Sequence, residues 1–206
     1  MVLPVSFWWT RYGTEAGETT ESILARKEAE RRRNGGIFLW GIGNALGPSL
    51  SLLLRETNSP EVLFSPISSP PRIQDVRPEQ LVRWHRGRTL DGRLMDLPEG
   101  SVVTSGARFH GRLRKRFALV CSSSTSVRPH EVGSLSVGAL TNLATGHRLG
   151  ASQVTAIVRF DRNLRNTGRS YAVALRARLV EPFLLELADP ELLESALGLP
   201  LFQQVA

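Results

Sequence analysis

The sequence predicts an α+β fold in which a mostly antiparallel, barrel-like β-sheet has short flanking helices. Several apolar segments follow one another with no helical segment between them, which favours antiparallel over parallel strands. The clearest of these, residues 152–160 and 171–180, contain stretches with apolar residues at alternate positions, as half-buried strands do. The helical segments are few and short. We expect the 206 residues to form a single domain, 1–206, with a C-terminal extension.

The N-terminal part of the chain predicts two strands and two helices. Residues 2–10 are rich in β-branched and aromatic side chains and predict a strand. Residues 20–33 predict a helix with Thr20 as its N-cap and with arginines in the last turn, where the helix dipole favours positive charge. Residues 37–42 predict a buried strand, and a second helix is expected to begin near Pro48. The apolar stripe of the first helix is weak and consists of Ile23, Leu24, Ala25 and Ala29.

The rest of the chain predicts further short elements. Residues 106–116 predict a basic hairpin or loop, and helices are expected at residues 78–86 and 190–197. Besides the two segments named first, strands are expected at residues 62–65, 101–105 and 117–121.

Positive charge is concentrated in the middle of the chain. The sequence has 26 Lys and Arg against 19 Asp and Glu, and all but two of the cations are arginines. Residues 72–130 hold twelve basic and five acidic residues and so carry the whole net charge of +7. A local excess of arginine is expected of a face that binds a polyanion, because guanidinium groups form paired hydrogen bonds with phosphates. The alternative is a solvated surface in a chain whose arginine content reflects codon bias.

The sequence predicts no metal site, cofactor, disulfide or membrane span. Cys121 is the single cysteine, and its place in an apolar run predicts a small buried side chain. No apolar run approaches the roughly 18 residues of a membrane helix. Features of a signal peptide are missing, so a cytoplasmic location is expected. The histidines lack the spacing of metal ligands; they are His85, His110, His130 and His147.

The sequence also predicts that the chain is not an enzyme. P-loop, nucleophile-elbow and dinucleotide-binding patterns do not occur. Gly41 and Gly43 begin a G-x-G pattern whose third glycine is replaced by Leu46. Glu28 and Glu30 are expected to be ordinary charges without a partner. The alternative is a catalytic site assembled from residues that are distant in the sequence.

Aromatic residues near the N-terminus are candidates for a base-binding pocket. Trp8 and Trp9 point to opposite faces of one predicted strand, so only one of them is expected to enter the core. Trp40 lies among glycines and is followed by Asn44, whose amide can donate and accept hydrogen bonds. An aromatic plane beside an amide can hold a planar base by stacking and by hydrogen bonds to its edge. Ordinary core packing is the alternative for each tryptophan.

Two arginine clusters are candidates for contacts with a nucleic-acid backbone. Arginines interleaved with aromatic residues suit phosphate contact combined with stacking. The alternative for the first cluster is a solvated hairpin tip. The first cluster surrounds Phe109 and consists of Arg108, His110, Arg112, Arg114, Lys115 and Arg116. The second surrounds Trp84 and His85 and consists of Arg83, Arg86, Arg88 and Arg93.

The order of these segments resembles the EVE domains of the PUA-like superfamily, which also includes the YTH domains. The sequence Phe-Trp-Trp-Thr at residues 7–10 resembles the first strand of EVE domains. The sequence Gly-Ile-Phe-Leu-Trp-Gly-Ile at residues 36–42 resembles a later, tryptophan-containing strand. Residues 98–103 echo a further family segment but lack its Asp and Tyr.

This resemblance implies a PUA-like β-barrel with an aromatic pocket that accepts a single base, often a modified one. In that fold, Trp40 would be a pocket wall and Asn44 would read the base edge or hold the backbone. The resemblance implies as pocket residues Trp40, Asn44, Tyr12 and either Trp8 or Trp9, with Ser105 and the serines at 122–124 as weaker candidates.

Together, these observations predict a non-catalytic reader of double-stranded DNA that carries a modified cytosine such as 5-methylcytosine. The flipped base would lie in the aromatic pocket, and the arginine-rich hairpin would hold the backbone. Two alternatives stay open. One is an RNA-binding PUA-like domain, and the other is a small-molecule or protein-interaction module whose basic face is incidental.

Overall fold

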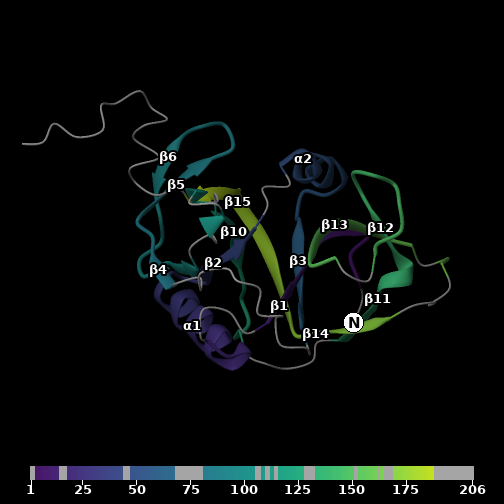
Figure 1. Cartoon of the computed structure of the whole chain (residues 1–206), viewed down its shortest axis with the longest axis horizontal. Helices are drawn as coiled ribbons and strands as arrows, with labels where there is room; N and C mark the ends of the chain where they lie inside the picture. Colours follow the sequence, from purple (N-terminus) through teal and green to yellow (C-terminus); the bar gives the residue numbers. More distant parts are fainter. Residues whose placement is uncertain are drawn as a thin grey trace, which may run out of the picture.

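The fold is known from a computed structural model and is mostly β, with two helices on its flanks (Figure 1). The helices are α1 (Thr20–Arg33) and α2 (Gly47–Glu56). The structure describes residues 3–13, 18–43, 47–67, 81–104, 108–109, 112–113, 116–127, 133–150, 153–161, 163–164 and 169–187.

One mixed sheet forms the centre of the molecule. All of its strand pairs are antiparallel except β1 and β3, which run parallel. The predicted α+β class is therefore confirmed, but within the described residues the sheet does not close into a barrel. In spatial order its main strands are β12 (Leu140–Asn142), β13 (Thr155–Phe160), β1 (Ser6–Tyr12), β3 (Glu61–Pro66), β15 (Leu175–Leu187), β10 (Arg116–Ser122) and β2 (Ile37–Ile42).

Shorter strands surround this sheet. β5 (Arg86–Thr89) pairs with the C-terminal half of β15, and β6 (Leu94–Asp96) pairs with β5. A 3-10 helix, η1, spans Val137–Ala139. Three separate pairs are β4 (Leu81–Arg83) with β7 (Val102–Thr104), β8 (Arg108–Phe109) with β9 (Arg112–Leu113), and β11 (Gly133–Ser136) with β14 (Ser170–Val173).

Both faces of the central sheet are buried, and this explains the tryptophan pair on β1. Trp8 lies in a core cluster that includes side chains from α1 and α2. Trp9 lies in a second cluster on the other face, which β11 and β14 cover with Leu135 and Tyr171. Each indole is 0% exposed. The prediction that only one of them enters the core is therefore wrong, because β11 and β14 form a second layer that covers the Trp9 face of the sheet.

Helix α1 has the predicted bounds but a different N-cap and a different buried face. The hydroxyl of Thr19, not Thr20, accepts the backbone N–H of Ser22. Ala25 and Ala29 are exposed, so the predicted apolar stripe is wrong in its second half. The side chains that face the sheet are Ile23, Leu24, Lys27 and Glu30, which share one side of the helix.

The helix ends in a glycine turn. Gly35 has φ of 60° and Gly36 of 101°, a region that side chains with a Cβ rarely adopt. The Gly36 N–H donates to the carbonyl of Arg31 at 2.8 Å, as in a Schellman motif. This turn ends the helix at the predicted C-terminal bound, Arg33.

Residues 81–83 and 86–89 form strands, so the helix predicted at residues 78–86 is wrong over its described part. Val82 pairs with Val103 of β7, and the indole N–H of Trp84 donates to the Val103 carbonyl at 3.1 Å. Val82 and Trp84 are half-buried while their neighbours are exposed, which is the period of a strand rather than a helix. The helix predicted at residues 190–197 lies outside the described residues.

The predicted segment at residues 171–180 is divided between two strands. β14 pairs with β11, whereas β15 begins at Leu175 and pairs with β3, β10 and β5 in turn. A register shift between Leu119 and Cys121 of β10 marks a bulge in β15, between Leu179 and Leu184. This bend lets one long strand join the central sheet to the β5–β6 pair.

Neither α1 nor α2, the two helices in the described part of the chain, combines the length and apolarity needed to cross a bilayer.

We predict that Gly41→Ala destabilises the fold by about 1–3 kcal/mol, because β7 packs closely over β2 at this position. A Cβ on Gly41 would lie 2.4 Å from the Val103 Cγ1 and 3.0 Å from the Arg116 Nη2. The matched control is Gly43→Ala, since a Cβ on Gly43 would have no neighbour within 4 Å. Urea unfolding measures both. Equal free energies of unfolding for the two variants would show that the close approach is not a constraint.

Candidate nucleic-acid interface

The aromatic residues predicted to form a base pocket lie in the core. Trp40 is 5% exposed and Tyr12 is 7% exposed. The Trp40 ring centroid lies 4.4 Å from that of Phe64, and the Tyr12 ring meets Trp40 edge-on at 5.4 Å. Tyr12 and Trp40 thus contact each other, but as core residues, and the Trp40 ring also packs against Phe64.

The two β1 tryptophans also have their polar groups satisfied inside the fold. The indole N–H of Trp8 donates to the Thr155 Oγ1 at 2.9 Å, and that of Trp9 donates to the Ser65 Oγ at 3.0 Å. A base could stack on either ring only after a buried hydrogen bond and its surrounding contacts were broken. These tryptophans therefore stabilise the sheet and do not line an open pocket.

Tyr12 lies near the first turn of α1. Burial raises the pKa of Tyr12 to about 12, and the nearby Glu21 carboxylate acts in the same direction. Its hydroxyl therefore stays protonated at neutral pH and can act as a hydrogen-bond donor.

Of the weaker candidates, Ser123 is buried and its hydroxyl donates to the Thr125 carbonyl at 2.9 Å, so it belongs to a local turn. The predicted site residues that lie outside the described residues are Asn44, Ser105, His110, Arg114 and Lys115.

The basic segment forms a hairpin, as predicted. Arg108 pairs with Leu113 and Phe109 pairs with Arg112, which makes β8 and β9 a two-stranded ribbon. Residues 105–116 contain five basic residues and no acidic residue, whereas residues 81–104 contain four basic and three acidic residues. The charge excess of the middle of the chain is therefore concentrated in this hairpin, which leads directly into the central strand β10.

Arg116 belongs to β10 and not to the β8–β9 ribbon. It is 8% exposed, and its guanidinium lies against the backbone of Gly41 on the neighbouring strand β2. A side chain in this position is not available to follow a nucleic-acid backbone. It instead fixes the base of the hairpin to the sheet.

The second predicted cluster is partly neutralised. Arg88 forms an ion pair with Glu186 at 3.1 Å, where both side chains are mostly buried. Arg86 pairs with Asp96 at 3.3 Å, but both side chains are exposed, so this pair contributes little. Arg83 and Arg93 are exposed. The β8–β9 hairpin is therefore the stronger of the two candidates.

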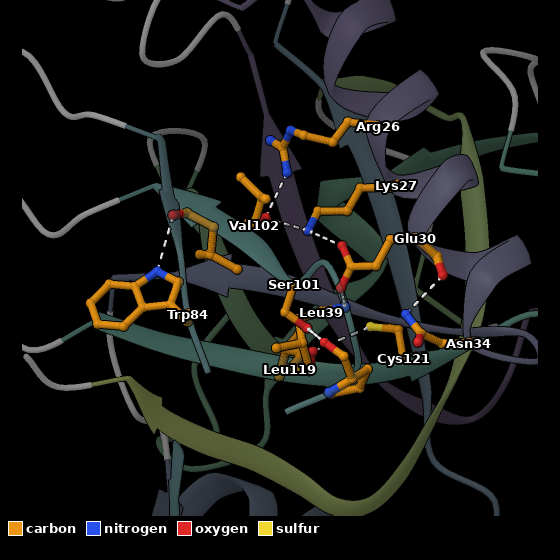
Figure 2. A network of polar contacts seen from close by, with 12 residues as sticks. Arg26, Lys27, Glu30, Asn34, Leu39, Trp84, Ser101, Val102, Leu119 and Cys121 are labelled. Atoms are coloured by element: carbon orange, nitrogen blue, oxygen red, sulfur yellow. Dashed lines mark hydrogen bonds and ion pairs between the residues drawn. The ribbon is translucent and has the colours of Figure 1, made fainter. Parts of the chain in front are cut away.

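A buried ion pair joins α1 to β2 and to β7, the strand that precedes the hairpin (Figure 2). The Lys27 Nζ donates to the Glu30 Oε2 and to the Val102 carbonyl, both at 2.8 Å. The other Glu30 oxygen accepts the Leu39 N–H at 2.8 Å. Both charged side chains are almost fully buried, and burial lowers the pKa of Lys27 while the Glu30 carboxylate opposes that shift. The prediction that Glu30 is an unpartnered charge is wrong.

Further contacts strengthen this junction. The Arg26 Nη1 donates to the same Val102 carbonyl at 2.6 Å and its guanidinium pairs with Glu18. Cys121 is buried nearby, as predicted, and burial raises the pKa of its thiol above the usual range. A neutral thiol in these surroundings behaves as a small apolar side chain.

Glu28 is the second acidic residue of α1 that proves to have partners. Its carboxylate accepts hydrogen bonds from Arg31 at 2.8 and 3.0 Å, from Arg32 at 2.7 Å and from the Val127 N–H at 2.7 Å. The Arg31 guanidinium contributes most to a pKa of Glu28 well below its usual range. Glu28 therefore ties the exposed side of α1 to the loop after β10, contrary to the prediction of an ordinary charge.

No protein family matches the chain, and no curated protein or solved structure matches it either. The resemblance to EVE domains therefore stays a prediction. Among the described residues, no group of three His, Cys, Asp or Glu side chains is arranged to hold a metal ion.

Sequence reasoning missed the residues that organise α1, although a signal was present. Residues 23, 24, 27 and 30 have the spacing of one helical face, so Lys27 and Glu30 continue the side that Ile23 and Leu24 bury. Two opposite charges on a buried face must pair with each other or with the strands beneath. Their partners on β2 and β7 are the backbone N–H of Leu39 and the backbone carbonyl of Val102. Backbone groups are the same in every residue, so the sequence carries no signal for these contacts.

We predict that Lys27→Met destabilises the protein by about 3–5 kcal/mol, because it leaves the Glu30 carboxylate buried without a counter-charge. The double variant Lys27→Met/Glu30→Leu should be destabilised by less than the sum of the two single variants. Urea unfolding of all four proteins completes the double-mutant cycle. Additive effects would mean that the two side chains do not interact.

We predict that Glu28 makes the protein sensitive to acid. Folding lowers the pKa of Glu28. Its contribution to the free energy of unfolding is therefore complete above the unfolded pKa of about 4.3 and is lost as the pH falls below that value. Glu28→Gln should lower the free energy of unfolding at pH 7 by about 1–3 kcal/mol and should flatten its decrease between pH 5 and pH 3. Glu99→Gln, at an exposed position, is the control. The same acid profile in wild type and Glu28→Gln would refute this role.

Proposed function

We propose that the chain is a non-catalytic module that binds duplex DNA, and that the β8–β9 hairpin makes the main contact. The observation that supports this most is the composition of the hairpin. Without counting the buried Arg116, the sequence from 108 to 115, which contains the paired strands β8 and β9, has four basic residues and no acidic residue. Guanidinium groups on such a ribbon can bind phosphates on both sides of a groove.

The shape of the contact element favours duplex DNA over duplex RNA. The major groove of B-DNA is roughly 12 Å wide and admits a two-stranded β-ribbon. The major groove of A-form RNA is deep and narrow, and side chains do not reach its base edges. For this reason we propose DNA as the partner, with the RNA-binding alternative as an outcome of the test.

The packing at both ends of the hairpin supports a preorganised contact. Before the hairpin, Arg26 and Lys27 hold the Val102 carbonyl of β7. After it, Arg116 is the first residue of the central strand β10, and its guanidinium lies against Gly41 of β2. A contact element that is fixed at its base loses less conformational freedom on binding than a free loop does.

The finer prediction, a PUA-like barrel that reads modified cytosine, receives less support. Trp40, its expected pocket wall, is packed between Tyr12 and Phe64. We therefore propose that affinity comes from phosphate and groove contacts. A preference for modified cytosine would require the Trp40 ring to leave the core, and it is tested in the same experiment.

The test is the salt dependence of binding to one fluorescent duplex, measured by anisotropy at several KCl concentrations. Removing one cation that binds a phosphate reduces the slope of log K against log [KCl] by about 0.9. Arg108→Gln/Arg112→Gln should therefore reduce the slope by roughly 2 and weaken binding about tenfold or more at low salt. The control is Arg148→Gln/Arg178→Gln, which removes the same charge from exposed positions elsewhere and should change neither quantity.

The outcomes separate the alternatives. If both double variants changed the salt slope and the affinity equally, DNA would be attracted by the net charge of the protein alone. This result would overturn the role of the hairpin. No binding would favour the small-molecule or protein-interaction module. Tighter binding to an RNA duplex of the same sequence would favour the RNA alternative. Tighter binding to a duplex with 5-methylcytosine, abolished by Trp40→Phe, would restore the base-pocket hypothesis.

A further inference from the structure

Two arginines converge on one tyrosine at the end of β1. The Arg11 guanidinium carbon lies 4.4 Å from the centre of the Tyr171 ring, and that of Arg169 lies 5.5 Å from the same centre. Arg11 lies near the C-terminal end of β1 and Arg169 immediately precedes β14, which is close to β1 in Figure 1. Residues 158 positions apart in the sequence thus form one cationic group.

The sheet fixes this arrangement. Phe7, Trp9 and Arg11 alternate on the same face of β1, so Arg11 lies where the core formed by the first two residues ends. Trp9 also contacts Tyr171, with ring centroids 5.6 Å apart. The Arg11 N–H donates to the Val154 carbonyl at 2.7 Å, and the Arg169 carbonyl accepts the Val137 N–H at 3.1 Å. Both backbones are therefore held in place.

The positive charge of this group is not compensated by the part of the chain that the structure describes. In that part, neither Arg11 nor Arg169 forms an ion pair or a side-chain hydrogen bond, whereas Arg26, Arg31 and Arg88 all pair with carboxylates. The Arg11 Nε is buried and has no hydrogen-bond partner among the described residues. Two guanidinium groups on one ring repel each other, and a partly buried cation without an anion is unfavourable.

We propose that Arg11 and Arg169 form a binding site for a phosphate group, either free phosphate or a phosphomonoester. Two cations match the charge of a phosphate dianion, and the planar donor edge of each guanidinium matches its oxygens. The cation–π contact with the Tyr171 ring holds the Arg11 guanidinium in place without using its hydrogen-bond donors. This site is on other strands than the β8–β9 hairpin and does not depend on the proposed binding of DNA.

The first experiment measures the melting temperature in phosphate and in chloride at the same ionic strength and pH. A ligand that binds the folded state raises the melting temperature, and the rise increases with its concentration. The wild type and the control Arg178→Gln should be stabilised by phosphate, with Kd about tenfold weaker in Arg169→Gln. Arg169 is exposed, so this variant should fold even where Arg11→Gln does not. An equal response of Arg169→Gln and wild type, or no response of the wild type, would overturn the site.

A competition experiment identifies the source of the phosphate. A dinucleotide with a 5′-phosphate is titrated against phosphate-loaded protein, and the same dinucleotide without it is the control. Displacement by the phosphorylated form alone supports the site and assigns it to phosphomonoesters; no displacement by either form, with phosphate binding intact, assigns it to free phosphate. Arg108→Gln/Arg112→Gln should bind phosphate as the wild type does, so the failure of one proposal would not imply the failure of the other.

Discussion

The buried pair of Lys27 and Glu30 is the constraint on which the arrangement of α1 and the neighbouring strands depends. Each charge has protein partners that offset the cost of removing it from water, and those partners are on different elements. Lys27 reaches β7, and Glu30 reaches β2. The helix can therefore sit in only one register on the strands, because any shift would leave a charge or a backbone group without its partner.

This junction also bears on the proposed function. β7 leads into the basic hairpin and β10 leads out of it, so the hairpin begins and ends at strands that α1 and the central sheet hold. The aromatic residues, by contrast, are used for stability. Because layers cover both faces of the central sheet, Trp8, Trp9 and Trp40 pack inside it. For this reason the proposed contact with DNA rests on the arginines of the β8–β9 hairpin and not on the tryptophans.

The sequence predicted those elements whose local pattern is unambiguous. Helix 20–33 and strand 37–42 have the predicted bounds, because capping, an arginine-rich last turn and a glycine stop mark the first, and an uninterrupted apolar run marks the second. The hairpin at 106–116 also follows from local composition. Residues 81–86 were misassigned because Leu81, Val82 and Trp84 fit a short helix nearly as well as a strand.

What sequence could not reveal are the contacts between distant segments. The second cover of the sheet comes from β11 and β14, more than 120 residues after Trp9, so burial of both tryptophans had no local signal. The same is true of Arg11, Arg169 and Tyr171. Single-sequence patterns report the periodicity of one element, whereas these sites depend on which elements pack together.

The most direct test of the hairpin as the DNA contact is hydrogen–deuterium exchange of the protein with and without a saturating duplex. We expect slower exchange in peptides that cover residues 105–118, with unchanged exchange in residues 37–42 around Trp40. Slower exchange around Trp40 with an unchanged hairpin would contradict the account and would indicate a base pocket. Unchanged exchange in both segments, with DNA bound, would mean that the contact lies on another face.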